Sequence, residues 1–259
     1  MSPLHPIVSS LCIGFGIGEF RMNVVLIGGT VEALVLAHHL VKEHHVHVIE
    51  IEAELGLPAM HPGRVVQPNI LNEYMTEEQQ AFLLMSKNDQ GWGCRWDWLL
   101  KHLAANASRD GVVCMTRTRI LSCSKQGDQY SLELSSSERD LPTHLIADRV
   151  YQMDQTHDSS PGLRKHTLVP SQPSSFPSPP SAVWDGGTVL TADAETAPPT
   201  DLRLSRGDGM TELWWRDELA WEPPRGFFER TTAVLPSDSN ELCFDSIVSR
   251  VRAFLDEAV

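Results

Sequence analysis

The sequence has little positive charge. Its 259 residues include 21 lysines and arginines against 34 aspartates and glutamates, which gives a formal net charge of −13 at pH 7. The basic residues form no cluster large enough to outweigh this charge. A nucleic acid or an anionic membrane surface would repel such a chain. We therefore expect no nucleic-acid partner.

Cysteines are few, and their spacing follows no pattern. Their odd number and the lack of any C-x-x-C pair exclude a disulfide framework and a zinc ribbon. We expect cytoplasmic thiols that are mostly buried as small apolar residues. The five positions are Cys12, Cys94, Cys114, Cys123 and Cys243.

The sequence also lacks a long apolar run. Residues 7–20 are fairly apolar, but serine and glycine interrupt them, and the segment is too short to span a bilayer. It has neither the basic start nor the small-residue cleavage site of a signal peptide. We expect no membrane span, and we interpret residues 1–21 as an N-terminal appendage to a folded part that begins at Met22.

The patterns that mark common catalytic and metal sites are missing. No G-x-S-x-G predicts a serine nucleophile, and no H-E-x-x-H predicts zinc ligation. Five histidines between positions 38 and 47 straddle a predicted helix end and strand start, where solvated or capping roles are expected. We expect no metal site, and the sequence identifies no catalytic acid, base or nucleophile.

Residues 23–50 predict a strand, a glycine turn, a helix and a second strand. Residues 23–28 are a short β-branched run that ends at a glycine, which is typical of a buried parallel strand. Residues 30–43 carry apolar side chains at helical spacing, and residues 45–50 predict the second strand. Together they predict a βαβ unit with a right-handed crossover.

Further elements follow this unit up to about residue 156. Their order predicts an α/β fold, namely a Rossmann-like parallel sheet with a β-meander insertion, over residues 22–156. The expected elements are a short helix at 79–85, a helix at 97–107, a strand at 112–115, a hairpin at 117–124 and 129–135, and one strand at 145–153.

The composition changes after this domain. Residues 157–181 are rich in serine and proline, and we expect a linker without packed elements. Residues 182–259 predict a small β-rich C-terminal unit. It contains a hairpin around the polar turn 206–209 and a closing amphipathic helix at 245–257.

The turn after the first strand carries a degenerate glycine motif. In the pattern G-x-G-x-x-G, the glycines permit the tight turn, the approach of a pyrophosphate and close helix packing. Gly28 matches the first position, whereas Thr30 and Ala33 occupy the other two. Glu50 is an acidic residue at the end of the second strand. Here the sequence resembles the FAD-dependent oxidoreductases of the two-dinucleotide-binding-domain flavoprotein superfamily.

Other residues extend the resemblance over 22–165. Gly56 matches the first member of the superfamily's Gly-Gly doublet, with Leu57 in place of the second. Arg64 lies roughly where a basic residue follows that doublet. Asp154 is retained from an Ala-Asp-Gly turn that follows the meander.

The resemblance implies a cofactor and a reaction class. The cofactor would be FAD, with NAD(P) as the alternative dinucleotide, and the flavin would supply hydride or oxygen chemistry on an unidentified small-molecule substrate. Trp92, Trp96 and Trp98 fall where related flavoproteins place residues near the cofactor, or they pack in the core. The implied cofactor-binding residues are Gly28, Gly29 and Thr30 at the pyrophosphate, Glu50 at the ribose, and Gly56, Arg64 and Asp154, the last two nearer the flavin.

Four departures from the pattern, of which Leu57 in the doublet is one, favour a different hypothesis. Thr30 puts a β-branched side chain where the backbone should meet the phosphates, and Glu32 would repel a pyrophosphate at the helix N-terminus. The superfamily's second Gly-Asp region is missing, because Gly207-Asp208 lies in a predicted hairpin turn. The alternative is a pseudo-flavoprotein that lost the cofactor and acts as a binding or scaffold subunit of a complex. An exposed Trp214/Trp215 pair would then form its contact surface.

The chain length limits both hypotheses. After the nucleotide domain, the appendage and the linker, too little sequence remains for a full substrate domain. We expect either that another chain completes the ligand site, in a homo- or hetero-oligomer, or that the domain needs no such site.

Overall fold

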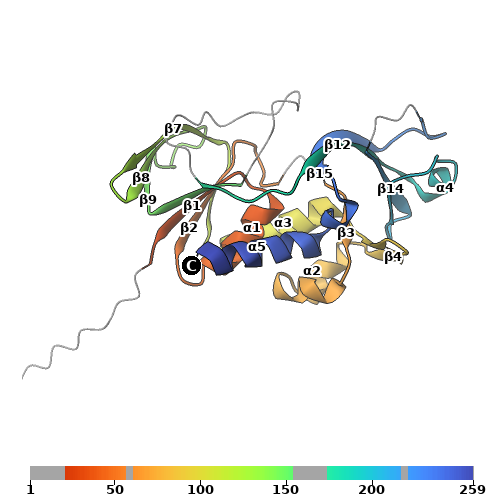
Figure 1. Cartoon of the computed structure of the whole chain (residues 1–259), viewed down its shortest axis with the longest axis horizontal. Coiled ribbons are helices and arrows are strands. Elements are labelled where there is room, and N and C mark those ends of the chain that lie inside the picture. Colours follow the sequence, from red (N-terminus) through yellow and green to blue (C-terminus); the bar gives the residue numbers. More distant parts are fainter. Residues whose placement is uncertain (1–20, 57–60, 154–173, 217–220, 259) are drawn as a thin grey trace, which may run out of the picture.

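A parallel sheet organises the N-terminal part of the molecule. The structure is a computed structural model that describes residues 21–56, 61–153, 174–216 and 221–258. The sheet has five strands in the order β11–β10–β1–β2–β6, and α1, α3 and α5 lie together on one side of it (Figure 1). The predicted α/β class is confirmed. The elements are β1 (Asn23–Ile27), β2 (His45–Ile49), β6 (Val113–Met115), β10 (Arg149–Gln152), β11 (Ser174–Ser175), α1 (Val31–Leu40), α3 (Trp96–Arg109) and α5 (Phe244–Ala258).

Strand β1 is buried on both faces, which explains its unbroken apolar sequence. Val24 and Leu26 pack with the helices, whereas Val25 and Ile27 pack in a second cluster with the meander. Side chains alternate between the two faces of a strand, so a sheet that is covered on both sides needs apolar residues at every position. The parallel pairing of β1 with β2 confirms the predicted βαβ unit.

The β-meander consists of β7 (Thr118–Gln126), β8 (Gln129–Ser136) and β9 (His144–Ala147). The predicted single strand at 145–153 is wrong, because the chain changes sheets at Asp148. Strand β9 pairs with β8, whereas β10 pairs with β1. The Asp148 carboxylate accepts hydrogen bonds from the Asn23 N–H (2.7 Å) and the Gln129 amide (2.8 Å), so it joins the two sheets where the strand divides.

Short elements connect β2 to α3. Strands β3 (Arg64–Val65), β5 (Gly91–Gly93) and β4 (Ser86–Asn88) form a small antiparallel sheet. Helix α2 (Glu77–Ala81) begins earlier than the predicted helix at 79–85, because Thr76 and Gln79 form a capping box at its start. Among the described residues, no helix has the length and the apolar character that a membrane crossing requires.

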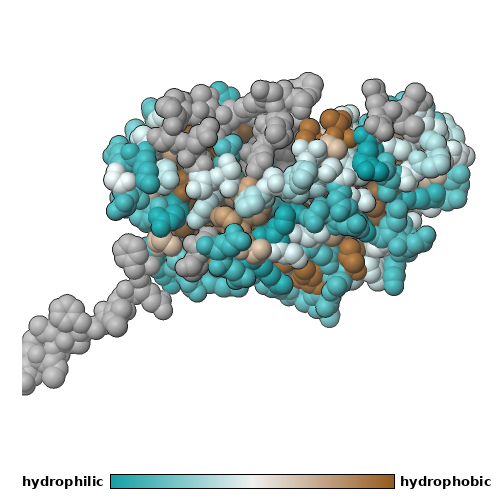
Figure 2. Space-filling model, viewed as in Figure 1, coloured by the Kyte–Doolittle hydropathy of each residue, from teal (hydrophilic) through white to brown (hydrophobic). Residues whose placement is uncertain are grey.

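The C-terminal sheet is antiparallel, with the order β13–β14–β12–β15. The predicted hairpin is confirmed, and Asp208 stabilises its turn by accepting a hydrogen bond from the Met210 N–H (3.1 Å). Trp214 and Trp215 are buried, at 4% and 6% exposure, so they do not form the exposed pair that the scaffold hypothesis would need. The face of the molecule in Figure 2 is mostly hydrophilic, with small separate apolar patches. The elements are β12 (Ser181–Leu190), α4 (Thr191–Ala194), β13 (Leu202–Ser205), β14 (Met210–Trp215) and β15 (Glu229–Pro236).

Two segments lie elsewhere than the sequence predicts. Residues 174–181 were expected within an unpacked linker, but β11 pairs with β10 and Phe176 is buried against Phe254 of α5. Helix α5, expected in the C-terminal unit, joins the core that α1 and α3 form under the parallel sheet. Residues 154–173, which include the rest of the linker, lie outside the described residues.

Candidate functional site

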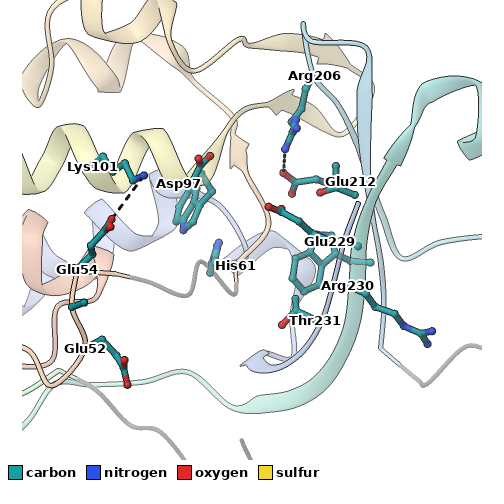
Figure 3. A pocket seen from close by; sticks show the side chains of 15 residues that line it. Glu52, Glu54, His61, Asp97, Lys101, Arg206, Glu212, Glu229, Arg230 and Thr231 are labelled. Carbon is teal, nitrogen blue, oxygen red and sulfur yellow. Dashed lines mark hydrogen bonds and ion pairs between the residues drawn. The ribbon is translucent and has the colours of Figure 1, made fainter. Parts of the chain in front are cut away.

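A cavity of about 670 Å³ lies between the N-terminal domain and the C-terminal sheet. Its volume falls in the range of pockets for small molecules. Figure 3 shows Asp97 and His61 on one side and Glu212 and Glu229 on the other. The lining residues are Glu52, Ala53, Glu54 and His61 from the loops after β2, Trp96, Asp97 and Lys101 from α3, and Gly187, Thr188, Arg206, Glu212, Trp214, Glu229, Arg230 and Thr231 from the C-terminal sheet and its hairpin turn.

Close backbone contacts hold the two walls of this cavity together. The Gly63 N–H donates to Glu212 Oε2 on β14 (2.9 Å), and a Cβ atom at Gly63 would lie 2.0 Å from the Cys94 carbonyl oxygen. A Cβ atom at Gly93 would lie 2.2 Å from the Ser205 carbonyl oxygen of β13. Both positions therefore require glycine, and the Gly63–Glu212 hydrogen bond and the Gly93–Ser205 contact join the two walls.

A buried charged group stands on the sheet side of the cavity. Arg206 donates to Glu212 (3.3 Å) and to Asp208 (2.8 Å), and its side chain is 10% exposed. Burial raises the pKa of the Glu212 carboxyl, against the opposing effects of the Gly63 N–H and the Arg206 guanidinium. The two acidic partners raise the pKa of Arg206 despite its own burial. Glu212 is thus the carboxyl group of the site whose proton affinity is most clearly altered.

Aromatic rings form another part of the lining. His61 stacks on Trp96, with 4.5 Å between ring centroids and an interplanar angle of 17°. On the sheet side, Trp214 is directly opposite Gly186 of β12, and a Cβ atom there would come within 2.2 Å of the indole. The missing side chain at Gly186 therefore lets the Trp214 ring lie against the neighbouring strand. Trp96 is the one of the three early tryptophans that lines the cavity.

The pKa of His61 makes stability depend on pH. Burial lowers this pKa below 6.5, more than the Pro62 carbonyl and Glu32 raise it. The unfolded chain then binds more protons than the folded chain as the pH falls below 6.5, so folding stability decreases toward acid. Glu212 acts in the opposite direction, since its raised pKa costs stability as the pH rises through it.

We therefore expect His61→Gln to reduce the acid sensitivity of the fold. The urea midpoint of the wild type should fall between about pH 7.5 and about pH 5.5 by more than the midpoint of the variant. Glu212 is present in both proteins, so its contribution cancels in the comparison. If the urea midpoint fell by the same amount in both proteins over this pH range, the effect could not be assigned to His61.

The turn expected to bind a dinucleotide is formed, and four of its predicted residues meet there. Gly28 has a positive φ of 97° and donates its N–H to the Ile49 carbonyl (2.8 Å). The Gly29 N–H donates to Glu50 Oε2 (2.7 Å), and the Glu52 N–H donates to Glu50 Oε1 (3.0 Å). Thr30 caps α1 by accepting from the Ala33 N–H (3.2 Å). Gly28, Gly29, Thr30 and Glu50 thus lie together at this turn.

The other predicted residues are placed differently. Gly56 packs on α3, since a Cβ atom there would lie 2.5 Å from Leu100 Cδ2. Arg64 donates to the carbonyl oxygens of Gln90 and Ser239, both at 2.7 Å, and does not line the cavity. Asp154 lies outside the described residues. Among the described residues, no group of histidine, cysteine and carboxylate side chains is arranged to hold a metal ion.

The residues at this turn do not fit the pyrophosphate of FAD. The Gly29 and Ala33 N–H groups, which would face a phosphate, already donate to Glu50 and Thr30. Glu32 stands in the first turn of α1 and holds Arg250 of α5 at 3.2 Å. Arg250 also pairs with Glu241, so this arginine is committed to two carboxylates. Two of the N–H groups that a dinucleotide would need at this turn are therefore already bound within the chain.

The sequence did not identify the residues that dominate the cavity. Glu212 lies 149 residues from the Gly63 N–H that it accepts, and nothing in the local pattern of β14 distinguishes it. The one local signal was the polar turn after β13, which holds Arg206 and its partner Asp208. His61 and Glu229 carried no signal of their own.

Comparisons with known proteins show which solved structures have the same fold. No protein-family model matches the chain, and no curated protein matches its sequence. Among solved structures, a geranylgeranyl bacteriochlorophyll reductase-like protein from Thermoplasma acidophilum matches with a TM-score of 0.57 and 13% identity, covering 84% of this chain and 67% of that one. The p-nitrophenol 4-monooxygenase PnpA from Pseudomonas putida DLL-E4 matches with a TM-score of 0.56 and 11% identity, covering 83% and 68%. The chain has the fold of the FAD-dependent oxidoreductase superfamily, as the sequence resemblance implied.

Proposed function

We propose that this chain is a small-molecule-binding protein on the flavoprotein fold that no longer binds FAD. The observation that carries this proposal is the hydrogen bonding within the turn, in which Glu50 and Thr30 accept the N–H groups of Gly29 and Ala33. The cavity between α3 and the C-terminal sheet is the binding site. Because Trp214 and Trp215 are buried, the cavity rather than a tryptophan surface supports a binding role.

The absorbance spectrum of the purified protein tests this proposal. We expect no paired near-ultraviolet and blue bands, and no saturable uptake when FAD is added. A protein that carries these bands, or that takes up FAD stoichiometrically, would contradict the proposal. The measurement needs no knowledge of the substrate.

A variant that removes the Thr30 cap and the Glu32 carboxylate from the turn provides a sharper test. In the double variant Thr30→Gly, Glu32→Ala, the Ala33 N–H is released and a repelling carboxylate is removed, so affinity for FAD should rise about tenfold, or about 1.4 kcal/mol. The matched control is Thr76→Gly, which removes the same kind of cap from α2, away from the turn. An equal gain in the control, or none in the double variant, would show that the obstruction lies elsewhere.

The second candidate is an FAD-dependent oxidoreductase. It is favoured by Glu50, which lies at the end of β2 beside Gly29, where a carboxylate binds ribose hydroxyls. The cavity also begins close to this carboxylate, at Glu52 and Glu54. A bound flavin would supply the hydride or oxygen chemistry, and Glu50 would hold the ribose. The same spectrum decides between the two candidates.

A further inference from the structure

We propose that the cavity binds a small organic cation that also carries a hydrogen-bond acceptor, such as an amino alcohol or its quaternary ammonium form. This inference rests on the proposed function, because it assigns a ligand class to the same cavity. Three observations support it: the balance of charge on the walls, the aromatic lining, and one buried donor without a well-aligned partner.

The positive side chains of the cavity are already paired. Lys101 lies 3.8 Å from Glu54. Arg230 pairs with Asp185 and with Glu222, both at 3.0 Å. Arg206 is held by Glu212 and Asp208, as described above. An anionic ligand would therefore have to displace an existing ion pair.

Two carboxylates of the lining are not paired. Within the described ranges, Glu52 and Glu229 form no ion pair. Figure 3 shows Glu229 pointing into the cavity from the sheet side. A positive ligand would find these charges available, and the net charge of −13 would favour its approach. The electrostatic field of the site thus selects a cation.

The rest of the lining adds shape and a hydrogen bond. The stacked His61–Trp96 pair and Trp214 line the cavity, although each tryptophan is only 4% exposed. Aromatic rings attract ammonium groups. The Trp214 indole N–H is buried beside Glu212 and lowers the pKa of that carboxyl, but it meets no described residue in well-aligned hydrogen-bond geometry. A buried donor without a well-aligned partner is costly, so an acceptor on the ligand would stabilise the complex. A hydroxyl or carbonyl oxygen next to the cationic group meets this need.

Choline and three analogues of similar size test the proposal directly. Choline has a quaternary ammonium group and a hydroxyl oxygen, and dimethylbutanol replaces the charged nitrogen by carbon. Dimethylbutyrate carries the opposite charge, and tetramethylammonium lacks the acceptor. Binding to the full chain is followed by tryptophan fluorescence and by titration calorimetry. We expect choline to bind at least about tenfold more tightly than the alcohol, which corresponds to about 1.4 kcal/mol.

The other ligands and the salt dependence test the roles of the acceptor and of the positive charge separately. Tetramethylammonium should bind several-fold more weakly than choline, and equal binding would overturn the role of the acceptor. High salt should weaken the binding of choline but not of the alcohol. If the alcohol or the acid binds as well as choline, or if none binds at millimolar concentration, the cation proposal is wrong.

A matched pair of variants assigns the effect to the cavity. Glu229→Gln removes an unpaired carboxylate without changing its size, and choline affinity should fall by about threefold or more while the alcohol is unaffected. Glu43→Gln makes the same change at an exposed position in the turn between α1 and β2, and it should leave choline affinity unchanged. The proposals fail separately: bound FAD in the spectrum contradicts the proposed function, whereas a colourless protein that does not prefer choline contradicts only this inference.

Discussion

Replacing Arg206 by methionine should reduce the free energy of unfolding by about 3–5 kcal/mol. The guanidinium is 10% exposed and lies between Glu212, at 9%, and Asp208, at 20%. Methionine fills most of the space but leaves the Glu212 carboxylate buried without its cation, and this uncompensated charge causes the loss. Urea denaturation of both proteins at neutral pH measures the difference.

Two further variants show whether burial is the cause. Glu212→Gln in the Arg206→Met background removes the stranded charge and should recover at least about 1 kcal/mol. Arg216→Met is the control, because Arg216 forms a comparable 3.0 Å pair with Asp201 but is 56% exposed. That exposed pair should contribute only about 0–1 kcal/mol. If Arg206→Met costs no more than Arg216→Met, the buried charged group does not stabilise the fold.

The N-terminal elements were predictable because local patterns determine them. The apolar run at 23–28 requires a strand that is covered on both faces, and Val24 and Val25 do face opposite sides. The hairpin at 117–135 follows from alternation around a Gly127 turn. Glu50 was predictable in the same way, because a residue at the end of β2 must lie beside the turn after β1.

The remaining errors arise from contacts between distant segments. Nothing near Asp148 shows that the chain leaves one sheet for another there, since its partners are Asn23 and Gln129. Arg64 follows the doublet position as expected. Its side chain, however, donates to the carbonyl oxygen of Ser239, 175 residues away, and does not lie at the predicted site. The cavity has the same origin, because its walls meet only where Gly63 reaches Glu212.

Helix α5 is the element whose position most changes the interpretation of the chain. An amphipathic pattern shows that one face is buried but does not identify the surface that covers it. The structure places Phe244, fully buried, against Tyr74 at 5.4 Å and Trp96 at 6.5 Å between ring centroids. The last residues of the sequence therefore complete the core of the first domain and support the aromatic wall of the cavity.

Phe244→Ala should consequently destabilise the whole protein, by about 3–5 kcal/mol, because the surrounding rings cannot fill the space that the phenyl group leaves. Circular dichroism and tryptophan fluorescence should report the same lowered urea midpoint if α5 unfolds together with the parallel sheet. Choline binding should also weaken in the folded variant, since Trp96 loses a neighbour. Phe228→Ala is the control, because this phenylalanine is 61% exposed and its loss should change stability by only about 0.5 kcal/mol. Two separate transitions, with only the C-terminal one shifted, would show that α5 belongs to an independent unit after all.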